Sequence, residues 1–99
     1  MFKFEDVMDL DNRAIQSVLR EINGEDLILA LKGADKELRE KILGNMSQRA
    51  AEQLREDLES KGPVKLADVE KQQREFLKIV RRLAEEGQIS MGGKSDQMV

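Results

Sequence analysis

The apolar residues of this chain recur with the period of an α-helix, and no stretch of convincing length alternates as a β-strand does. Near the N-terminus they fall at positions i, i+3, i+4 and i+7, namely Ile15, Val18, Leu19 and Ile22. This spacing places the four side chains on one face of a helix. The sequence therefore predicts an all-α fold.

Polar caps and glycines divide the chain into predicted helices. Asp11, Asp35 and Ser47 have the side chains that N-caps require, whereas Gly33 and Gly62 are expected just after helix ends. The predicted helices span residues 12–22, ended by Asn23-Gly24, then 25–32, 36–43, 48–60 and 67–86. Residues 25–32 are apolar nearly all round and should be central to the core. The loops are short, which favours helices stacked on their sequence neighbours.

The composition argues against an enzyme. The 99 residues include no Cys and no His, which removes thiol nucleophiles, Cys/His zinc sites and the usual general base. Gly93-Lys94-Ser95 matches the end of a phosphate loop, but Gln88 stands where that pattern needs glycine. Acidic pairs such as Glu56-Asp57 lack the alternating ligands and central glycine of a calcium loop. We therefore expect no catalysis, no metal and no cofactor.

The charge pattern also limits the partners. The net charge is −3, with 17 Lys and Arg against 20 Asp and Glu, whereas nucleic-acid binders usually show a basic excess. No apolar run approaches the ~20 residues that a membrane-spanning helix needs. We expect one cytosolic domain over residues 1–99 that binds no nucleic acid and does not span a membrane. Residues 88–99 have little periodicity and are expected to be a mobile tail.

The predicted helix 48–60 has one apolar and one charged side. Ala51, Leu54 and Leu58 lie within about 40° of Ser47 on a helical wheel. Arg49 and Glu56 lie about 180–200° away and form a ridge on the opposite side of the helix. Asp57 lies beside this ridge, and Lys65 follows the last turn of the helix. The charged side is either a surface that binds a partner or simply a solvated helix face, and the wheel alone leaves both open.

The opening sequence MFKF holds two of the three aromatic residues, Phe2 and Phe4. One interpretation is a hydrophobic staple that fixes the N-terminus against the core. The other is a hinge or docking plug for a neighbouring domain. The residues alone do not decide between them.

Four segments together resemble the C-terminal domain family of the bacterial flagellar motor switch protein FliG. They are MFKF at 1–4, ALKGAD at 30–35, NMSQRAAEQLREDLESKGPV at 45–64 and IVRRLAEEGQI at 79–89. The resemblance covers essentially the whole chain. It implies a compact, armadillo-like superhelical arrangement of about six helices, in which residues 5–9 could supply the first.

The resemblance also implies a function. It suggests a rotor domain that generates torque against the cytoplasmic loop of the stator protein MotA and takes part in switching the direction of rotation. Its other implied partners are the switch protein FliM and neighbouring FliG subunits in a ring, in the cytoplasm at the flagellar basal body, peripheral to the inner membrane. The implied torque residues are Lys32, Arg49, Glu56, Asp57 and Lys65, and the implied hinge is Met1, Phe2, Lys3 and Phe4. The alternative is a generic helical scaffold for protein–protein interaction.

Overall fold

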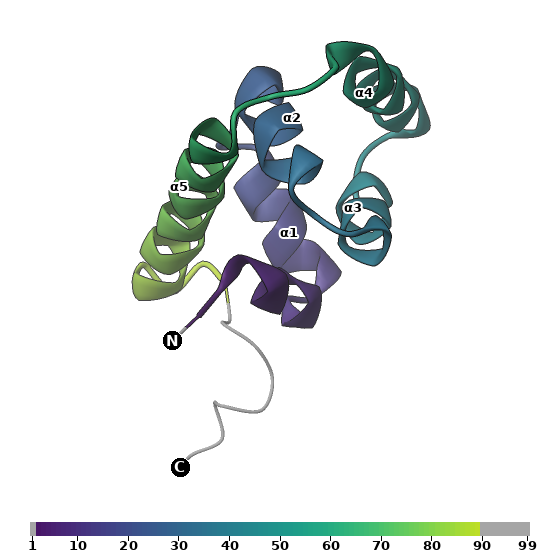
Figure 1. Ribbon diagram of the computed structural model, residues 1–99. Coiled ribbons are helices and arrows are strands. Elements are labelled where there is room, and N and C mark those ends of the chain that lie inside the picture. Colours follow the sequence, from purple (N-terminus) through teal and green to yellow (C-terminus); the bar gives the residue numbers. More distant parts are fainter. Residues whose placement is uncertain (1, 90–99) are drawn as a thin grey trace.

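The structure, a computed structural model, describes residues 2–89, and this part of the chain is helical without strands (Figure 1). Six helices follow one another: η1, a 3₁₀-helix (Phe4–Asp9), α1 (Asn12–Leu19), α2 (Gly24–Lys32), α3 (Lys36–Leu43), α4 (Gln48–Lys61) and α5 (Leu66–Glu85). The predicted all-α class and the number of helices are confirmed.

The predicted N-caps begin their helices as expected. Asp11 accepts a hydrogen bond from the backbone N–H of Ala14 at 2.8 Å, and Asp35 and Ser47 make the equivalent bonds to Leu38 and Ala50. Asn23 differs from the prediction, because its side chain caps α2 by accepting from the Asp26 N–H at 2.9 Å. The preceding helix therefore ends at Leu19 rather than at residue 22.

The two glycines expected after helix ends behave differently. Gly62 has a φ of 75°, the left-handed conformation that favours glycine. Gly33 ends α2 with a φ of −98°, so its conformation does not require glycine. Its lack of a side chain instead makes room for α5, because a Cβ there would lie 2.5 Å from Cγ1 of Val69.

Helix α2 lies at the centre of the fold, as its apolar sequence predicts (Figure 1). It packs most extensively against α5 and also against α4. The main contacts otherwise differ from the expected stacking of sequence neighbours, because α5 also packs against α1 and η1, and η1 against α3. Helix α5 can span three elements because its 20 residues carry one long buried stripe: Val69, Phe76, Val80 and Leu83.

The N-terminal segment is part of the core. Phe4 is 9% exposed, and its ring meets that of Phe76 edge-on, with centroids 5.3 Å apart. Phe2 is half-buried against the same core, and the Lys3 N–H donates to Asp6 Oδ2 at 2.7 Å. This packing supports the staple interpretation, whereas the hinge stays a prediction. Met1 lies outside the described residues.

The predicted mobile tail is described only over its first two residues. The Gln88 N–H donates to the Leu83 carbonyl at 2.9 Å, and Ile89 packs against the core. Residues 90–99, including Gly93-Lys94-Ser95, lie outside the described part of the chain.

A candidate charged interaction surface

Helix α4 is held by its apolar side. Ala51, Leu54 and Leu58 are 6%, 5% and 8% exposed and belong to the single core cluster. The predicted buried stripe is therefore confirmed. Because these three side chains fix the rotation of α4 about its axis, they also fix which of its charges face solvent.

The opposite side of α4 presents charges to solvent. Arg49 and Glu56 are exposed, and neither forms an ion pair within 4.0 Å among residues 2–89. Asp57 is half-buried and accepts a hydrogen bond from Gln53 Nε2 at 3.1 Å. These side chains can therefore meet charges on another molecule without first breaking an internal pair.

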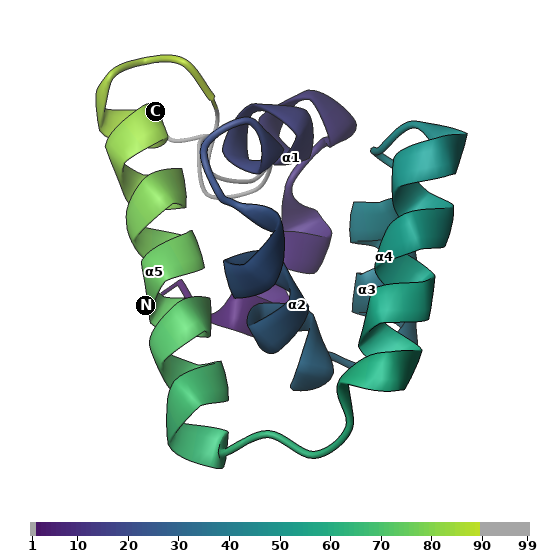
Figure 2. The same ribbon diagram turned by 90° about the horizontal axis from the view of Figure 1, so that it is seen from above.

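The two predicted lysines lie where α2 meets α5. Lys32 is the last residue of α2 and is half-buried, while Lys65 is exposed at the N-cap of α5. Gln73 of α5 donates from Nε2 to the Ala30 carbonyl at 3.1 Å, which ties the end of α2 to the start of α5. Residues 62–65 run directly from α4 to this junction (Figure 2). The structure thus puts three of the five predicted charges on α4 and two at the junction that follows it.

One charged contact of α4 was not predicted from the sequence. Arg55 Nη2 lies 2.6 Å from Glu40 Oε1 on α3, and both side chains are about half exposed. The hydrogen bond from the guanidinium lowers the pKa of Glu40, and the carboxylate raises the pKa of Arg55. Opposite charges on consecutive helices make such a pair possible. The sequence alone does not show which side chains of two packed helices come to lie opposite each other.

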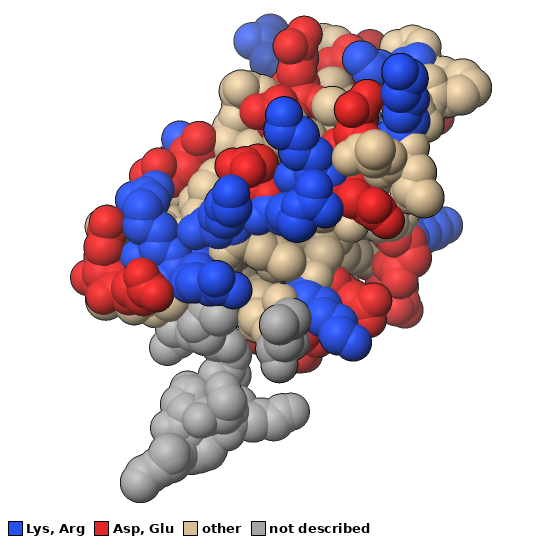
Figure 3. All heavy atoms as spheres, turned by 60° about the vertical axis from the view of Figure 1, so that its left-hand side comes forward, with Lys and Arg blue, Asp and Glu red and all other residues tan. Residues whose placement is uncertain are grey.

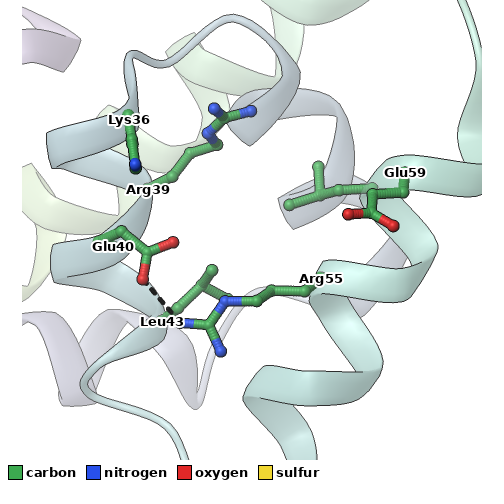
Figure 4. A pocket seen from close by; sticks show the side chains of 7 residues that line it. Lys36, Arg39, Glu40, Leu43, Arg55 and Glu59 are labelled. Carbon is green, nitrogen blue, oxygen red and sulfur yellow. Dashed lines mark hydrogen bonds and ion pairs between the residues drawn. The ribbon is translucent and has the colours of Figure 1, made fainter.

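This ion pair crosses a groove of about 280 Å³ between α3 and α4 (Figure 4). Leu43 and Leu58, both buried, line it together with charged side chains. The charged lining residues are Lys36, Arg39, Glu40, Arg55 and Glu59. The groove offers a mixed charged rim rather than a deep apolar pocket.

The charged side chains of residues 2–89 lie at the surface of the domain. No charged or polar residue of the described part is buried, whereas catalytic carboxylates are usually tuned by desolvation. Residues 2–89 contain no group of three or more acidic side chains that could hold a metal ion. No helix among them is long and apolar enough to cross a bilayer. The described part is thus an all-helical domain whose charged side chains lie at its surface.

Comparison with known proteins places this domain in a family. A family model described as the FliG C-terminal domain matches residues 1–91. The flagellar motor switch protein FliG of Pseudomonas aeruginosa is 54% identical over 97 residues, or 98% of this chain. The FliG of Thermotoga maritima is 57% identical over 89 residues, or 90% of the chain. The chain belongs to the FliG C-terminal domain family.

Solved structures agree with this assignment. A crystal structure of FliG residues 116–343 from Helicobacter pylori matches 93% of this chain with a TM-score of 0.89 and 48% identity, and the match covers 40% of that chain. The structure of full-length FliG from Aquifex aeolicus matches 91% with a TM-score of 0.86 and 42% identity, covering 28% of that chain. The chain spans 29% of the Pseudomonas protein and 27% of the Thermotoga protein.

Proposed function

We propose that this domain generates torque in the flagellar motor through electrostatic contacts between the α4 surface and the cytoplasmic loop of the stator protein MotA. The torque residues would be Lys32, Arg49, Glu56, Asp57 and Lys65. Membership of the FliG family supports a role in the flagellar motor. The observation that carries the electrostatic mechanism is that Arg49 and Glu56 are exposed and form no ion pair within residues 2–89.

Surface charge suits a contact that must form and break repeatedly. An exposed ion pair contributes only about 0–1 kcal/mol, and its field is screened over roughly 8 Å at physiological salt. A partner that moves past such charges is attracted and then released, whereas a large apolar interface would hold it. Several small contributions also make the contact tolerant of losing one charge.

The same proposal includes the domain's place in the motor. The domain would sit in the cytoplasm at the basal body, peripheral to the inner membrane, in a ring with other FliG subunits and in contact with the switch protein FliM. Its part in switching would depend on Met1, Phe2, Lys3 and Phe4 as a hinge to the preceding part of the protein. The half-buried position of Phe2 at the start of the described chain is compatible with such a connection.

Charge reversal tests the electrostatic mechanism. We expect Arg49→Asp to reduce motor torque in swimming or tethered-cell assays, and a reversed charge on the stator loop to restore it. Arg20→Asp is the matched control, because Arg20 is exposed and unpaired within residues 2–89 but lies at the end of α1. The mechanism is wrong if no stator reversal compensates Arg49→Asp, or if Arg20→Asp reduces torque equally.

A further inference from the structure

Helix α5 carries a row of positive charges that the torque residues do not include. We call Lys71, Arg74, Lys78 and Arg81 the basic row; all four side chains are exposed. Their spacing of three, four and three residues places them on one face of the helix. Figure 3, in which the side of α5 comes forward, shows Lys and Arg side chains gathered there. The row is a local positive surface on a chain whose net charge is −3.

The molecule itself neutralises only part of this charge. Lys78 Nζ lies 3.3 Å from Glu75 Oε2. Lys71, Arg74 and Arg81, in contrast, have no ion pair within 4.0 Å among residues 2–89. Most of the basic row is therefore available to negative charges on another body.

Acidic side chains border the row without filling it. Residues 71–82 hold five Lys and Arg against one acidic residue. Glu70 precedes this stretch, and Glu85 and Glu86 follow it, but Glu86 already pairs with Arg82 at 3.4 Å. The middle of the outer face of α5 thus presents a strip of net positive charge about 15 Å long.

The basic row contains no exposed apolar anchor. Among residues 2–89 the exposed large hydrophobic side chains are Met8 and Leu66, and neither stands between Lys71 and Arg81. Interfaces between proteins usually centre on aromatic or aliphatic side chains that become buried, and the row offers none. A layer of phosphate headgroups needs no such anchor, because it attracts clustered Lys and Arg by charge alone.

We infer that the basic row docks the domain on the surface of a bilayer of anionic phospholipids. The contact is electrostatic, because the apolar side of α5, with Phe76 and Val80, stays in the core of the domain. Each Lys or Arg near such a surface strengthens binding about fivefold, so a single copy binds weakly and reversibly. The inference deepens the proposed position beside the inner membrane and rests on that part of the proposed function alone.

Docking through α5 leaves the proposed torque surface free. Helices α4 and α5 lie on opposite sides of α2 (Figure 1, Figure 2), so a flat surface along the outer face of α5 does not cover Arg49 or Glu56. Lys65, at the N-cap of α5, lies about 120° around the helical wheel from Lys71. The lipid contact and the stator contact therefore use different surfaces.

Vesicle flotation tests the contact directly. We expect the 99-residue chain to float with vesicles in which half of the phosphatidylcholine is replaced by phosphatidylglycerol, and not with phosphatidylcholine alone. Binding at ~0.01 M salt should be lost at ~1 M salt, because the Debye length shrinks from about 30 Å to about 3 Å. Equal flotation with both kinds of vesicle, or none with the anionic kind at low salt, would overturn the inference.

Two double variants test whether the row itself is responsible. Lys71→Gln with Arg74→Gln removes two charges of the row and should weaken binding to anionic vesicles about 25-fold. The control, Lys36→Gln with Lys61→Gln, makes the same change in net charge at exposed sites of α3 and α4 and should bind as the unchanged chain does. Glutamine is a good helix former, so both variants keep the fold. An equal loss in the two variants would contradict docking through the row.

A fluorescent label locates the contact without changing the row. The chain has no cysteine, so Ala67→Cys and Ser60→Cys each give one site for an environment-sensitive fluorophore. Ala67 is exposed and lies between Lys71 and Arg74 on the helical wheel, whereas Ser60 is exposed on α4. We expect anionic vesicles to shift the emission of the label at position 67 and to leave that at position 60 unchanged. Equal shifts at both positions would count against the inference.

Duplex DNA provides the last comparison, because it also carries dense phosphate charge. If DNA bound the chain at low salt while anionic vesicles did not, the row would be a surface for nucleic acid and the inference would be wrong. Because the stator test uses Arg49 in cells, failure of vesicle binding would leave the torque mechanism untouched.

Discussion

At the scale of single residues, Gly33 shows that a glycine can be required by a neighbour rather than by its own backbone. Its φ is negative, yet an added Cβ would lie 2.5 Å from Val69 Cγ1 and 2.8 Å from Gln73 Nε2. Gln73 also holds the end of α2 through the Ala30 carbonyl. Any side chain at position 33 would therefore push apart the junction beside Lys32 and Lys65.

We predict that Gly33→Ala destabilises the domain by about 1–3 kcal/mol, the usual cost of overpacking a close contact. Gly24→Ala is the matched control, since nothing lies within 4 Å of its Cβ position, and surface changes of this kind stay within about 0.5 kcal/mol. Chemical denaturation followed by circular dichroism measures both. Equal stability of the two variants would show that α2 and α5 do not approach as closely as described.

At the scale of elements, the sequence predicted the features that depend on residues close together in the chain. Helix periodicity and the caps Asp11, Asp35 and Ser47 were enough to find the α-helices, since both signals lie within a few residues. The end of α1 was misplaced because Asn23 serves the following helix. The pairing of Glu40 with Arg55 was missed because it depends on how two helices are aligned, which no local pattern specifies.

The Glu40–Arg55 pair gives a pH-dependent prediction for α3 and α4. The pair lowers the pKa of Glu40. It therefore stabilises the folded state at pH values above the pKa that this carboxyl has in the unfolded chain. This stabilisation is lost as pH falls through the lowered folded pKa. We expect Arg55→Gln to raise the pKa of Glu40 towards its ordinary value, and its stability difference from the unchanged chain to vanish in acid.

Carboxyl NMR titration of Glu40 and unfolding at several pH values measure these two effects. Arg82→Gln is the control, because Arg82 pairs with Glu21 and Glu86 instead. An unchanged Glu40 titration in Arg55→Gln would contradict the pairing.

At the scale of the whole molecule, the first and last described helices share one core. Phe4 of η1 packs edge-on against Phe76 of α5, whereas Phe2 is only half-buried beside it. The sequence identified both phenylalanines as candidates for anchoring but could not say which one the core encloses. It also predicted that Arg49 and Glu56 of α4 would be exposed, but not that Asp57 would be half-buried or that Lys32 would end half-buried at the α2–α5 junction.

This arrangement separates the two roles suggested for the N-terminus. We expect Phe4→Ala to cost about 3–5 kcal/mol of stability, as a buried aromatic does. We expect Phe2→Ala to cost clearly less but to change the rotation bias of the motor. Unfolding measurements and tethered-cell recordings of both variants test this. A normal bias in Phe2→Ala would rule out its part in a hinge.

The central position of α2 has a mechanical consequence. It contacts α4 on one side and α5 on the other, through a tightly filled interior that yields little to compression. A force applied to the outer face of α4 is thus transmitted through the packed core rather than through the connecting loops. The domain would transmit a lateral force as a rigid body, with little of the displacement absorbed by deformation of the domain itself.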